Sequence, residues 1–176
     1  RWRALVVGLE TWNAGGLNPW PWQGFTLRAR LGVKGLGGRS DAWSVEGGWI
    51  RRPVLARRWG LSLAAGGAWS STDLPVDLQP RAGGPAGWVG QDRDSILAPR
   101  LLWGRVGLLL HLNREVRVEV AGAAGARTPD ALADARVLPG VQALLQWDSP
   151  LGPLHVGWAL GRGEQPGFVL DIGHEF

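Results

Sequence analysis

The side chains in this sequence that could do chemistry are its acids, its arginines and its three histidines. His111, His155 and His174 stand far apart without the spacing of metal ligands, and cysteine is absent. The sequence also lacks the motifs of a serine-nucleophile elbow, a zinc-protease helix, a phosphate-binding loop and a dinucleotide fold. It therefore predicts no catalytic residue, no metal site and no cofactor, and we expect no enzyme activity from this segment.

Many of the charged residues alternate with apolar residues, so that an extended chain would present the charges on one face. The charges that we assign to an inward face are Arg28, Arg30, Glu46, Arg105, Arg117, Glu119 and Asp171. Such charges could line a pore or hold a loop by charge-assisted hydrogen bonds. Because the interior of any β-barrel is polar and rich in ion pairs, we favour a structural role, with loop anchoring as the favoured specific role.

Alternation of apolar and polar residues with a period of two runs along the whole chain and predicts β-strands. It defines nine candidate strands, at residues 4–10, 25–34, 43–49, 59–69, 102–112, 115–120, 141–148, 154–160 and 167–176. With their flanking residues they approach the roughly 9–11 residues that a tilted strand needs to cross a bilayer. No apolar run reaches the roughly 18 residues of a membrane helix.

A soluble β-sandwich also alternates apolar with polar residues, but three features favour a transmembrane barrel. Tryptophans such as Trp43, Trp59 and Trp147 sit near strand ends, where an interfacial girdle belongs. The apolar face carries no charge within the strand centres, and short turns alternate with longer loops. We therefore predict an all-β, antiparallel transmembrane barrel domain over residues 1–176, with a long extracellular loop at 71–96. The alternative is a soluble sandwich that binds a ligand.

The odd number of predicted strands is informative, because single-chain bacterial barrels normally have an even number. An open sheet would leave two strand edges with unsatisfied backbone groups in lipid, which is prohibitive. We therefore expect either further strands on the N-terminal side or a second copy of the chain that closes the barrel as a homodimer.

The net charge of +4 comes almost wholly from arginine, since Lys34 is the only lysine. Acids and bases are interleaved, and no basic run with interleaved aromatic residues is present, so we expect no nucleic-acid partner. Arginines on the outside would instead suit bidentate contacts with the phosphates of lipopolysaccharide.

Several motifs, in the same order along the chain, resemble the barrel of the bacterial surface antigen superfamily. Leu145–Leu154 looks like the superfamily's W-x-S-P-x-G-P-L turn between its antepenultimate and penultimate strands. Gly167–Phe176 resembles the C-terminal signal that the barrel assembly machinery reads, carried by Phe168, Leu170, Ile172 and Phe176. The resemblance implies that this chain forms the last nine strands of a barrel of about sixteen, within the known range for such barrels.

The long loop indicates a branch of the superfamily. In insertases and two-partner secretion transporters this loop carries a V-R-G-F/Y motif, whose arginine reaches an interior carboxylate. The aligned residues here are Trp88-Val89-Gly90-Gln91, so the arginine is absent. The barrels of patatin-like phospholipases more often lack it, and the resemblance slightly favours that branch. The residues that resemble the loop motif are Gly83, Gly84, Val89, Gly90 and Asp94, and the charged residues expected to anchor the loop are Arg81, Asp92, Arg93 and Asp94.

The resemblance implies a location in the bacterial outer membrane, in contact with membrane lipid and lipopolysaccharide, and insertion by the barrel assembly machinery. The expected function is to anchor an N-terminal domain such as a patatin-like phospholipase, with a translocation path for that domain as an additional role. The alternative within the superfamily is the barrel of an outer-membrane protein assembly or two-partner secretion transporter.

Overall fold

The computed structural model describes residues 4–13, 23–32, 42–71, 74, 79–83, 88–90, 96–128, 136–149, 152–161 and 166–172. Its main sheet contains β1 (Ala4–Asn13), β2 (Gln23–Gly32), β3 (Trp43–Arg51), β4 (Val54–Ala56), β5 (Trp59–Ser70), β8 (Arg100–His111), β9 (Val116–Thr128), β10 (Arg136–Ser149), β11 (Gly152–Gly161) and β12 (Gly167–Ile172). A separate pair is formed by β6 (Arg81–Ala82) and β7 (Ile96–Leu97). Over these residues, no helix is long and apolar enough to cross a membrane.

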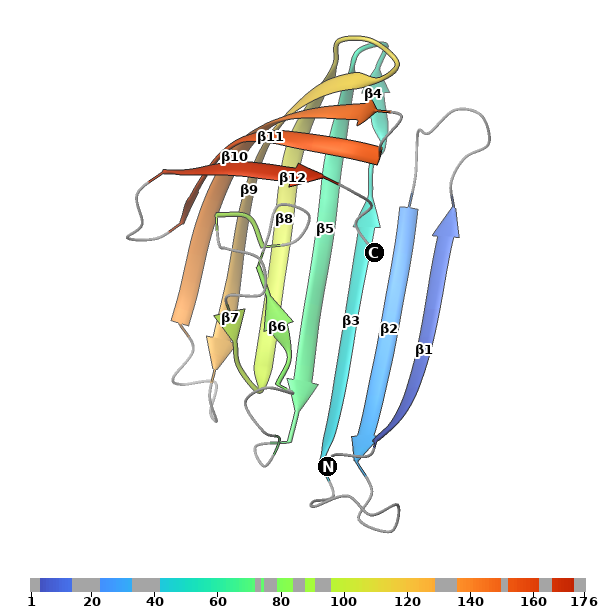
Figure 1. Ribbon diagram of the computed structural model, residues 1–176, viewed down its shortest axis with the longest axis vertical. Helices are drawn as coiled ribbons and strands as arrows, with labels where there is room; N and C mark the ends of the chain where they lie inside the picture. The colour runs from blue at the N-terminus through green and yellow to red at the C-terminus, as the bar shows by residue number, and fades with distance from the viewer. Residues whose placement is uncertain are drawn as a thin grey trace.

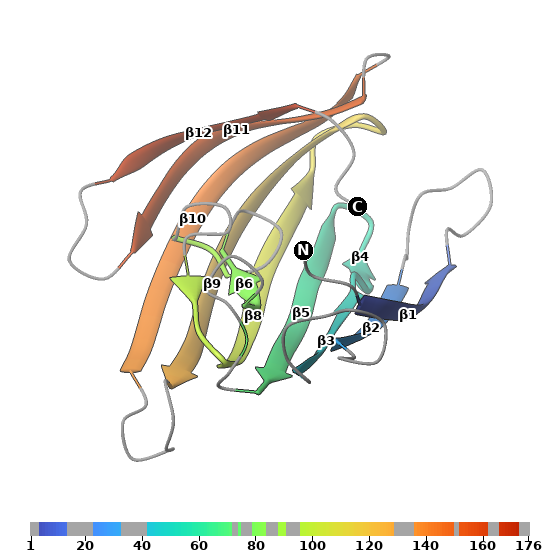
Figure 2. The same ribbon diagram turned by 60° about the horizontal axis from the view of Figure 1, so that its bottom comes forward.

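The sheet is a meander in which each long strand pairs antiparallel with the next long strand along the chain. Its order is β1-β2-β3-β5-β8-β9-β10-β11-β12, with β4 as a short addition beside β5. The ribbon curves into a trough, and β10, β11 and β12 turn over its concave side (Figures 1 and 2). In the part of the chain that the structure describes, the nine long strands, four before the long loop and five after it, agree with the predicted number, and β4 is a short addition. Among the described residues, β1 and β12 each have one unpaired edge.

The two faces of the sheet differ in the way that the alternation predicts. In β8, the convex face carries Leu102, Val106 and Leu108, whose exposed fractions are 68%, 60% and 44%. The concave face of the same strand carries Arg105 and Leu109, which are 3% and 0% exposed. The pattern is thus inverted relative to a soluble protein, because the large apolar side chains are exposed and the polar ones are buried.

Two strands are longer than the alternation predicts. β9 continues to Thr128 and β10 begins at Arg136, whereas the predicted strands covered 115–120 and 141–148. The additional part of β9 consists largely of alanine and glycine, which give almost no apolar–polar contrast. Its backbone is nevertheless paired in continuous register with β8 and β10. On the concave side, Ala123 and Gly125 are small because the loop between β5 and β8 lies against them.

Candidate functional site: an inserted loop and a buried charge chain

Part of the loop between β5 and β8 lies inside the trough. The β6–β7 pair lies over the concave face of β8 and β9, as both ribbon views show (Figures 1 and 2). Apolar residues of the loop form one buried cluster with the concave face of the main sheet, which we call the wall. The cluster is composed of Ala82, Trp88, Val89, Ile96, Ala98, Leu101 and Ala123. The loop is therefore packed into the interior by hydrophobic contacts.

Trp88 is the largest anchor of the loop. Its side chain is fully buried, and its indole Nε1 donates a hydrogen bond of 2.8 Å to the backbone oxygen of Leu138 in β10. The ring lies where a side chain on Gly125 would be, since an ideal Cβ there would stand 2.5 Å from Cζ2 of the indole. A buried indole needs an acceptor for its N–H, and the carbonyl of Leu138 supplies it.

The backbone after Trp88 approaches the wall closely, and glycine makes this approach possible on both sides. Gly90 has a φ of +77°, in the left-handed region that glycine tolerates, and a Cβ on it would collide with the backbone oxygen of Leu160. A Cβ on Gly140 of β10 would collide with the backbone oxygen of Val89. We call Trp88–Gly90 the inserted segment. It packs closely against β9, β10 and β11 because glycines leave room for its backbone and for the indole of Trp88.

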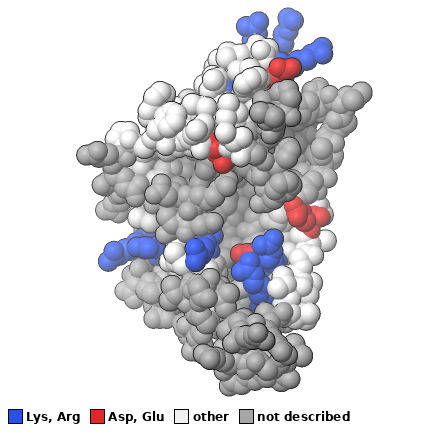
Figure 3. All heavy atoms as spheres, viewed as in Figure 1, with Lys and Arg blue, Asp and Glu red and all other residues white. Residues whose placement is uncertain are grey.

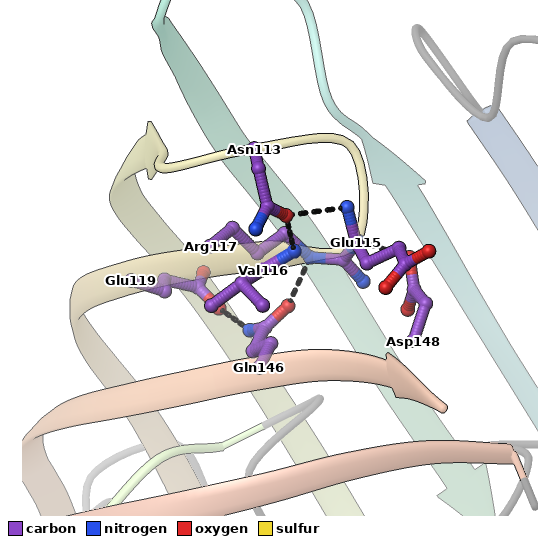
Figure 4. Close-up of polar contacts among 7 residues, drawn as sticks. All are labelled: Asn113, Glu115, Val116, Arg117, Glu119, Gln146 and Asp148. Atoms are coloured by element: carbon purple, nitrogen blue, oxygen red, sulfur yellow. Dashed lines mark hydrogen bonds and ion pairs between the residues drawn. The ribbon is translucent and has the colours of Figure 1, made fainter. Parts of the chain in front are cut away.

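A chain of charged and amide side chains crosses the concave face of β8, β9 and β10, and Figure 4 shows its part from Glu119 to Asp148. Arg105 in β8 forms an ion pair of 2.6 Å with Oε1 of Glu119 in β9, and their side chains are only 1% and 0% exposed. Oε2 of Glu119 accepts a hydrogen bond of 2.5 Å from the amide of Gln146 in β10. Arg117 then donates through Nε to the amide oxygen of Gln146, at 2.6 Å, and through Nη1 to Asp148, at 2.8 Å.

This chain joins three strands with balanced charge, since two arginines meet two carboxylates. Every link is a charge-assisted hydrogen bond, which is the geometry that allows ions to remain buried. Gly107 makes the arrangement possible, because a Cβ on it would lie 2.6 Å from Oε1 of Glu119. The turn that leads into β9 is fixed by Asn113, whose Oδ1 accepts hydrogen bonds from the backbone N–H groups of Glu115 and Val116 (Figure 4).

The other predicted inward charges lie in two separate groups. In β2 and β3, Arg28 and Arg30 both pair with Oε1 of Glu46, at 3.3 and 3.0 Å, and these side chains are partly exposed. Near the other edge of the sheet, His155 of β11 lies 3.8 Å from Asp171 of β12. The space-filling view shows basic and acidic side chains intermixed on the described part of this face (Figure 3). The seven predicted charges thus share one face but do not form one site.

Of the charged residues predicted to anchor the loop, the structure describes Arg81 alone. Arg81 is exposed at the start of β6, whereas Gly84, Asp92, Arg93 and Asp94 lie outside the described residues. Gly83 precedes that gap with a φ of 126°, a conformation suited to glycine. The anchors that sequence reasoning missed are Trp88 and the wall glycines Gly125 and Gly140. A large aromatic residue within a glycine-rich loop is the one signal that pointed to them.

The C-terminal signal residues are placed on the convex face. Phe168, Leu170 and Ile172 are 61%, 59% and 64% exposed, and Phe168 packs edge-on against Trp158 at 6.0 Å between ring centroids. Phe176 lies outside the described residues. Within the ranges that the structure describes, no group of three or more His, Cys, Asp or Glu side chains is arranged to hold a metal ion.

No protein-family model matches the sequence, and a search of curated proteins finds no match. Among solved structures, the chain is similar to BamA from Haemophilus ducreyi lacking POTRA domains 1–3, with a TM-score of 0.73 and 17% sequence identity. The similarity covers 96% of this chain and 40% of the BamA chain. The likeness therefore extends over almost the whole chain but less than half of its neighbour. The chain has the curved antiparallel sheet of a BamA-like β-barrel.

Proposed function

We propose that this chain is the C-terminal part of an outer-membrane β-barrel, and that it anchors an N-terminal domain in the membrane. The observation that supports this most directly is the apolar convex face, which carries Leu102, Val106, Val120, Val141 and Trp158 at 53–68% exposure. Monomeric soluble proteins rarely expose apolar patches of more than a few hundred Å². Lipid is the natural cover for such a face, because in membrane barrels the outward side is the apolar one.

A soluble β-sandwich would need a second sheet against this convex face. Among the described residues, the β6–β7 pair is the only second sheet, and it lies on the concave side. The concave side is also where Arg105, Glu119 and Gln146 are buried. A soluble sandwich of this kind would bury ion pairs and expose its apolar face to water. The hydrophobic effect would destabilise such a fold. The membrane barrel therefore explains both faces, and the sandwich explains neither.

Closure of the barrel follows from the edges of the sheet. In the described structure the outer edges of β1 and β12 are unpaired, and unpaired backbone groups are prohibitive in hydrocarbon. We propose that strands preceding β1 close the ring, in agreement with the 40% share of the BamA chain that this chain covers. A homodimer is the other way to close it. Chemical crosslinking of the full-length protein in detergent separates the two, since a monomeric heat-modifiable band supports closure within one chain.

The loop supports the branch that carries a patatin-like phospholipase. Aligned without gaps, Val89 stands where the superfamily's loop arginine would be, and the interior carboxylate of Glu119 is paired with Arg105 of β8. A loop arginine therefore has no free carboxylate to meet at Glu119, and the inserted segment is held by Trp88 and glycine packing. The second candidate is an assembly or secretion barrel, which the likeness to BamA favours.

The exposed apolar side chains of β12 suit recognition by the barrel assembly machinery during insertion. Phe168, Leu170 and Ile172 project from the same face of an edge strand. Such a strand offers both a row of unpaired backbone groups and an apolar face to a partner.

The experiment that tests the proposed function uses the full-length protein in its native membrane. Fractionation should place it in the outer membrane, extractable with detergent but not with high salt or alkali. Acyl-ester hydrolysis by the purified full-length protein, abolished by altering a serine outside residues 1–176, would support the patatin-like branch. Loss of other barrel proteins from the outer membrane on depletion, without such hydrolysis, would support the assembly branch instead. Recovery in a soluble fraction would contradict both.

A further inference from the structure

Exposed arginines gather at the end of the sheet where the turns are short, and the function above does not use them. The hairpin of β4 and β5 turns at Arg57 and Arg58, and the neighbouring β8–β9 turn carries Arg114. The two turns lie side by side, since the backbone N–H of His111 donates a hydrogen bond of 2.8 Å to the backbone oxygen of Arg58. Both turns lie at the upper end of the sheet in Figure 1, and basic side chains gather at that end in Figure 3. We call Arg57, Arg58 and Arg114 the basic tip.

The charge of the basic tip is not balanced by its neighbours. All three arginines are exposed, and none of them forms an ion pair with another described residue. Of the carboxylates described at this end, Glu115 offsets one of the three positive charges, and Asp148 is already paired with Arg117. The tip therefore keeps a net positive charge that can attract an anion.

The basic tip lies just beyond the apolar convex face. In β5 the exposed apolar side chains begin at Trp59, which directly follows Arg58, and beyond β8 they end at Leu112, two residues before Arg114. One residue advances an extended chain by about 3.3 Å, so each arginine lies within about 7 Å along the chain of an exposed apolar side chain. Tryptophan favours the border between hydrocarbon and headgroups. In a membrane, the arginines beyond Trp59 would therefore stand at the height of the lipid phosphates.

The turn beside the arginines also exposes apolar side chains. Val54 and Leu55 of β4 are 49% and 58% exposed, within three residues of Arg57. Mixed apolar and cationic groups suit the boundary between headgroups and acyl chains, where the apolar part is covered and the guanidinium reaches a phosphate. A purely aqueous, acidic partner would leave these two apolar side chains uncovered, so the composition of the turn favours a lipid.

We propose that the basic tip binds the headgroups of anionic phospholipids in the membrane leaflet at the short-turn end. This inference rests on the proposed function, because it requires the convex face to lie in the outer membrane with the long loop outside. In that orientation the short turns face the periplasm, and the leaflet on that side consists of phospholipid. A zwitterionic lipid brings an ammonium group as well as a phosphate, so unbalanced arginines favour a lipid with net negative charge.

Native mass spectrometry of the full-length protein in detergent micelles tests the site. With equal amounts of phosphatidylglycerol and phosphatidylethanolamine added, the unaltered protein should retain more phosphatidylglycerol. The double variant Arg57→Gln/Arg58→Gln should lower the ratio of bound phosphatidylglycerol to phosphatidylethanolamine by about tenfold, because each arginine near an anionic lipid surface contributes about fivefold in affinity. Addition of Arg114→Gln should lower the ratio further. Leu55→Ser removes an apolar contact and no charge, so it should weaken retention of both lipids and leave their ratio unchanged.

The matched control removes two arginines from the opposite end of the sheet. Arg127 and Arg136 are paired across β9 and β10, and the alternation of these strands puts both on the concave face, away from lipid. Arg127→Gln/Arg136→Gln changes the net charge by the same amount. It should leave the lipid ratio within about twofold of the unaltered protein, since neither side chain faces the lipid and distant charges are screened by salt.

An equal fall of the ratio in the two double variants would overturn the proposal, as would equal retention of the two lipids by the unaltered protein. A ratio that Arg57→Gln/Arg58→Gln leaves unchanged would also overturn it, and would leave an acidic protein segment as the partner of the basic tip. These results would come from a heat-modifiable outer-membrane protein. Failure of the proposed function would appear separately, as loss of that behaviour in the unaltered protein.

Discussion

Gly140→Ala should release the inserted segment from the barrel interior while leaving the sheet intact. A Cβ at this position collides with the backbone oxygen of Val89. A backbone atom cannot relieve the clash by rotating about a side-chain bond, so the whole segment must move. Residue 140 is itself paired in the ladders with both β9 and β11, so the wall has little freedom to yield. The segment that moves is therefore Trp88–Gly90.

The size of the effect follows from what the inserted segment loses. Trp88 and Val89 are both fully buried, and truncation of a buried tryptophan in other proteins costs about 3–5 kcal/mol. The hydrogen bond from the indole to Leu138 contributes about 1 kcal/mol more. Even the lower end of the tryptophan range alone, about 3 kcal/mol of docking free energy, changes the exposed fraction of the segment by about a hundredfold.

The absence of cysteine from these residues provides the assay. Val89→Cys places one thiol in the inserted segment, and cysteine behaves as a small apolar residue in a buried site. In the full-length protein, with any other cysteine replaced, a polyethylene-glycol maleimide should label residue 89 slowly. Addition of Gly140→Ala should raise the labelling rate by about a hundredfold, because labelling follows the opened population.

The matched control is Gly104→Ala, since a Cβ on Gly104 meets nothing within 4 Å. It should leave both the labelling rate and the stability of the sheet unchanged. Labelling in the Gly140→Ala protein as slow as in its parent would refute the packing argument. So would a rate increase of the same size in the Gly104→Ala protein.

Three further substitutions test the charge chain and the loop anchor. Glu119→Gln removes the negative charge that the buried Arg105 pairs with and should lower unfolding stability by about 3 kcal/mol, measured by urea titration of heat-modifiability. Glu46→Gln, whose partners are partly exposed, should cost less than about 1 kcal/mol in the same titration. Trp88→Phe keeps most of the buried area but loses the indole hydrogen bond, so it should speed labelling of residue 89 only about fivefold. A larger effect from Glu46→Gln than from Glu119→Gln would contradict the burial argument.

The positions of the strands along the chain and the division of faces could be predicted from the sequence because both depend on one local property. A period of two places Leu102, Val106 and Leu108 on one side of any extended chain, whatever its neighbours are. The alternation failed between residues 121 and 127, where alanine and glycine provide no contrast. On the concave face, Ala123 and Gly125 are small because the loop packs against them, and the local sequence does not reveal a partner more than 30 residues away.

The candidate site was harder to predict, because ion-pair partners depend on strand register. The alternation assigned Arg105, Arg117 and Glu119 to one face but could not show which of them pair. In the register of β8 against β9, Arg105 lies opposite Ala123 and Glu119 lies opposite Leu109, so the ion pair runs diagonally along the face beside Gly107. Gln146 joins the chain because the register of β10 against β9 places it opposite Arg117.

Of the charged loop anchors predicted from the sequence, Asp92, Arg93 and Asp94 lie outside the described residues, so that prediction stands as it was. The contacts of Trp88 with Leu138 and Gly125, which the sequence did not predict, hold the described part of the loop.

The most direct test of the central claim is the mobility of the full-length protein on a semi-native gel, with and without boiling, after extraction from the membrane. A closed barrel in the outer membrane predicts a compact, fast-migrating band that shifts on boiling and that appears only in the detergent extract of that membrane. A protein that stays soluble without detergent and shows the same mobility before and after boiling would contradict the account.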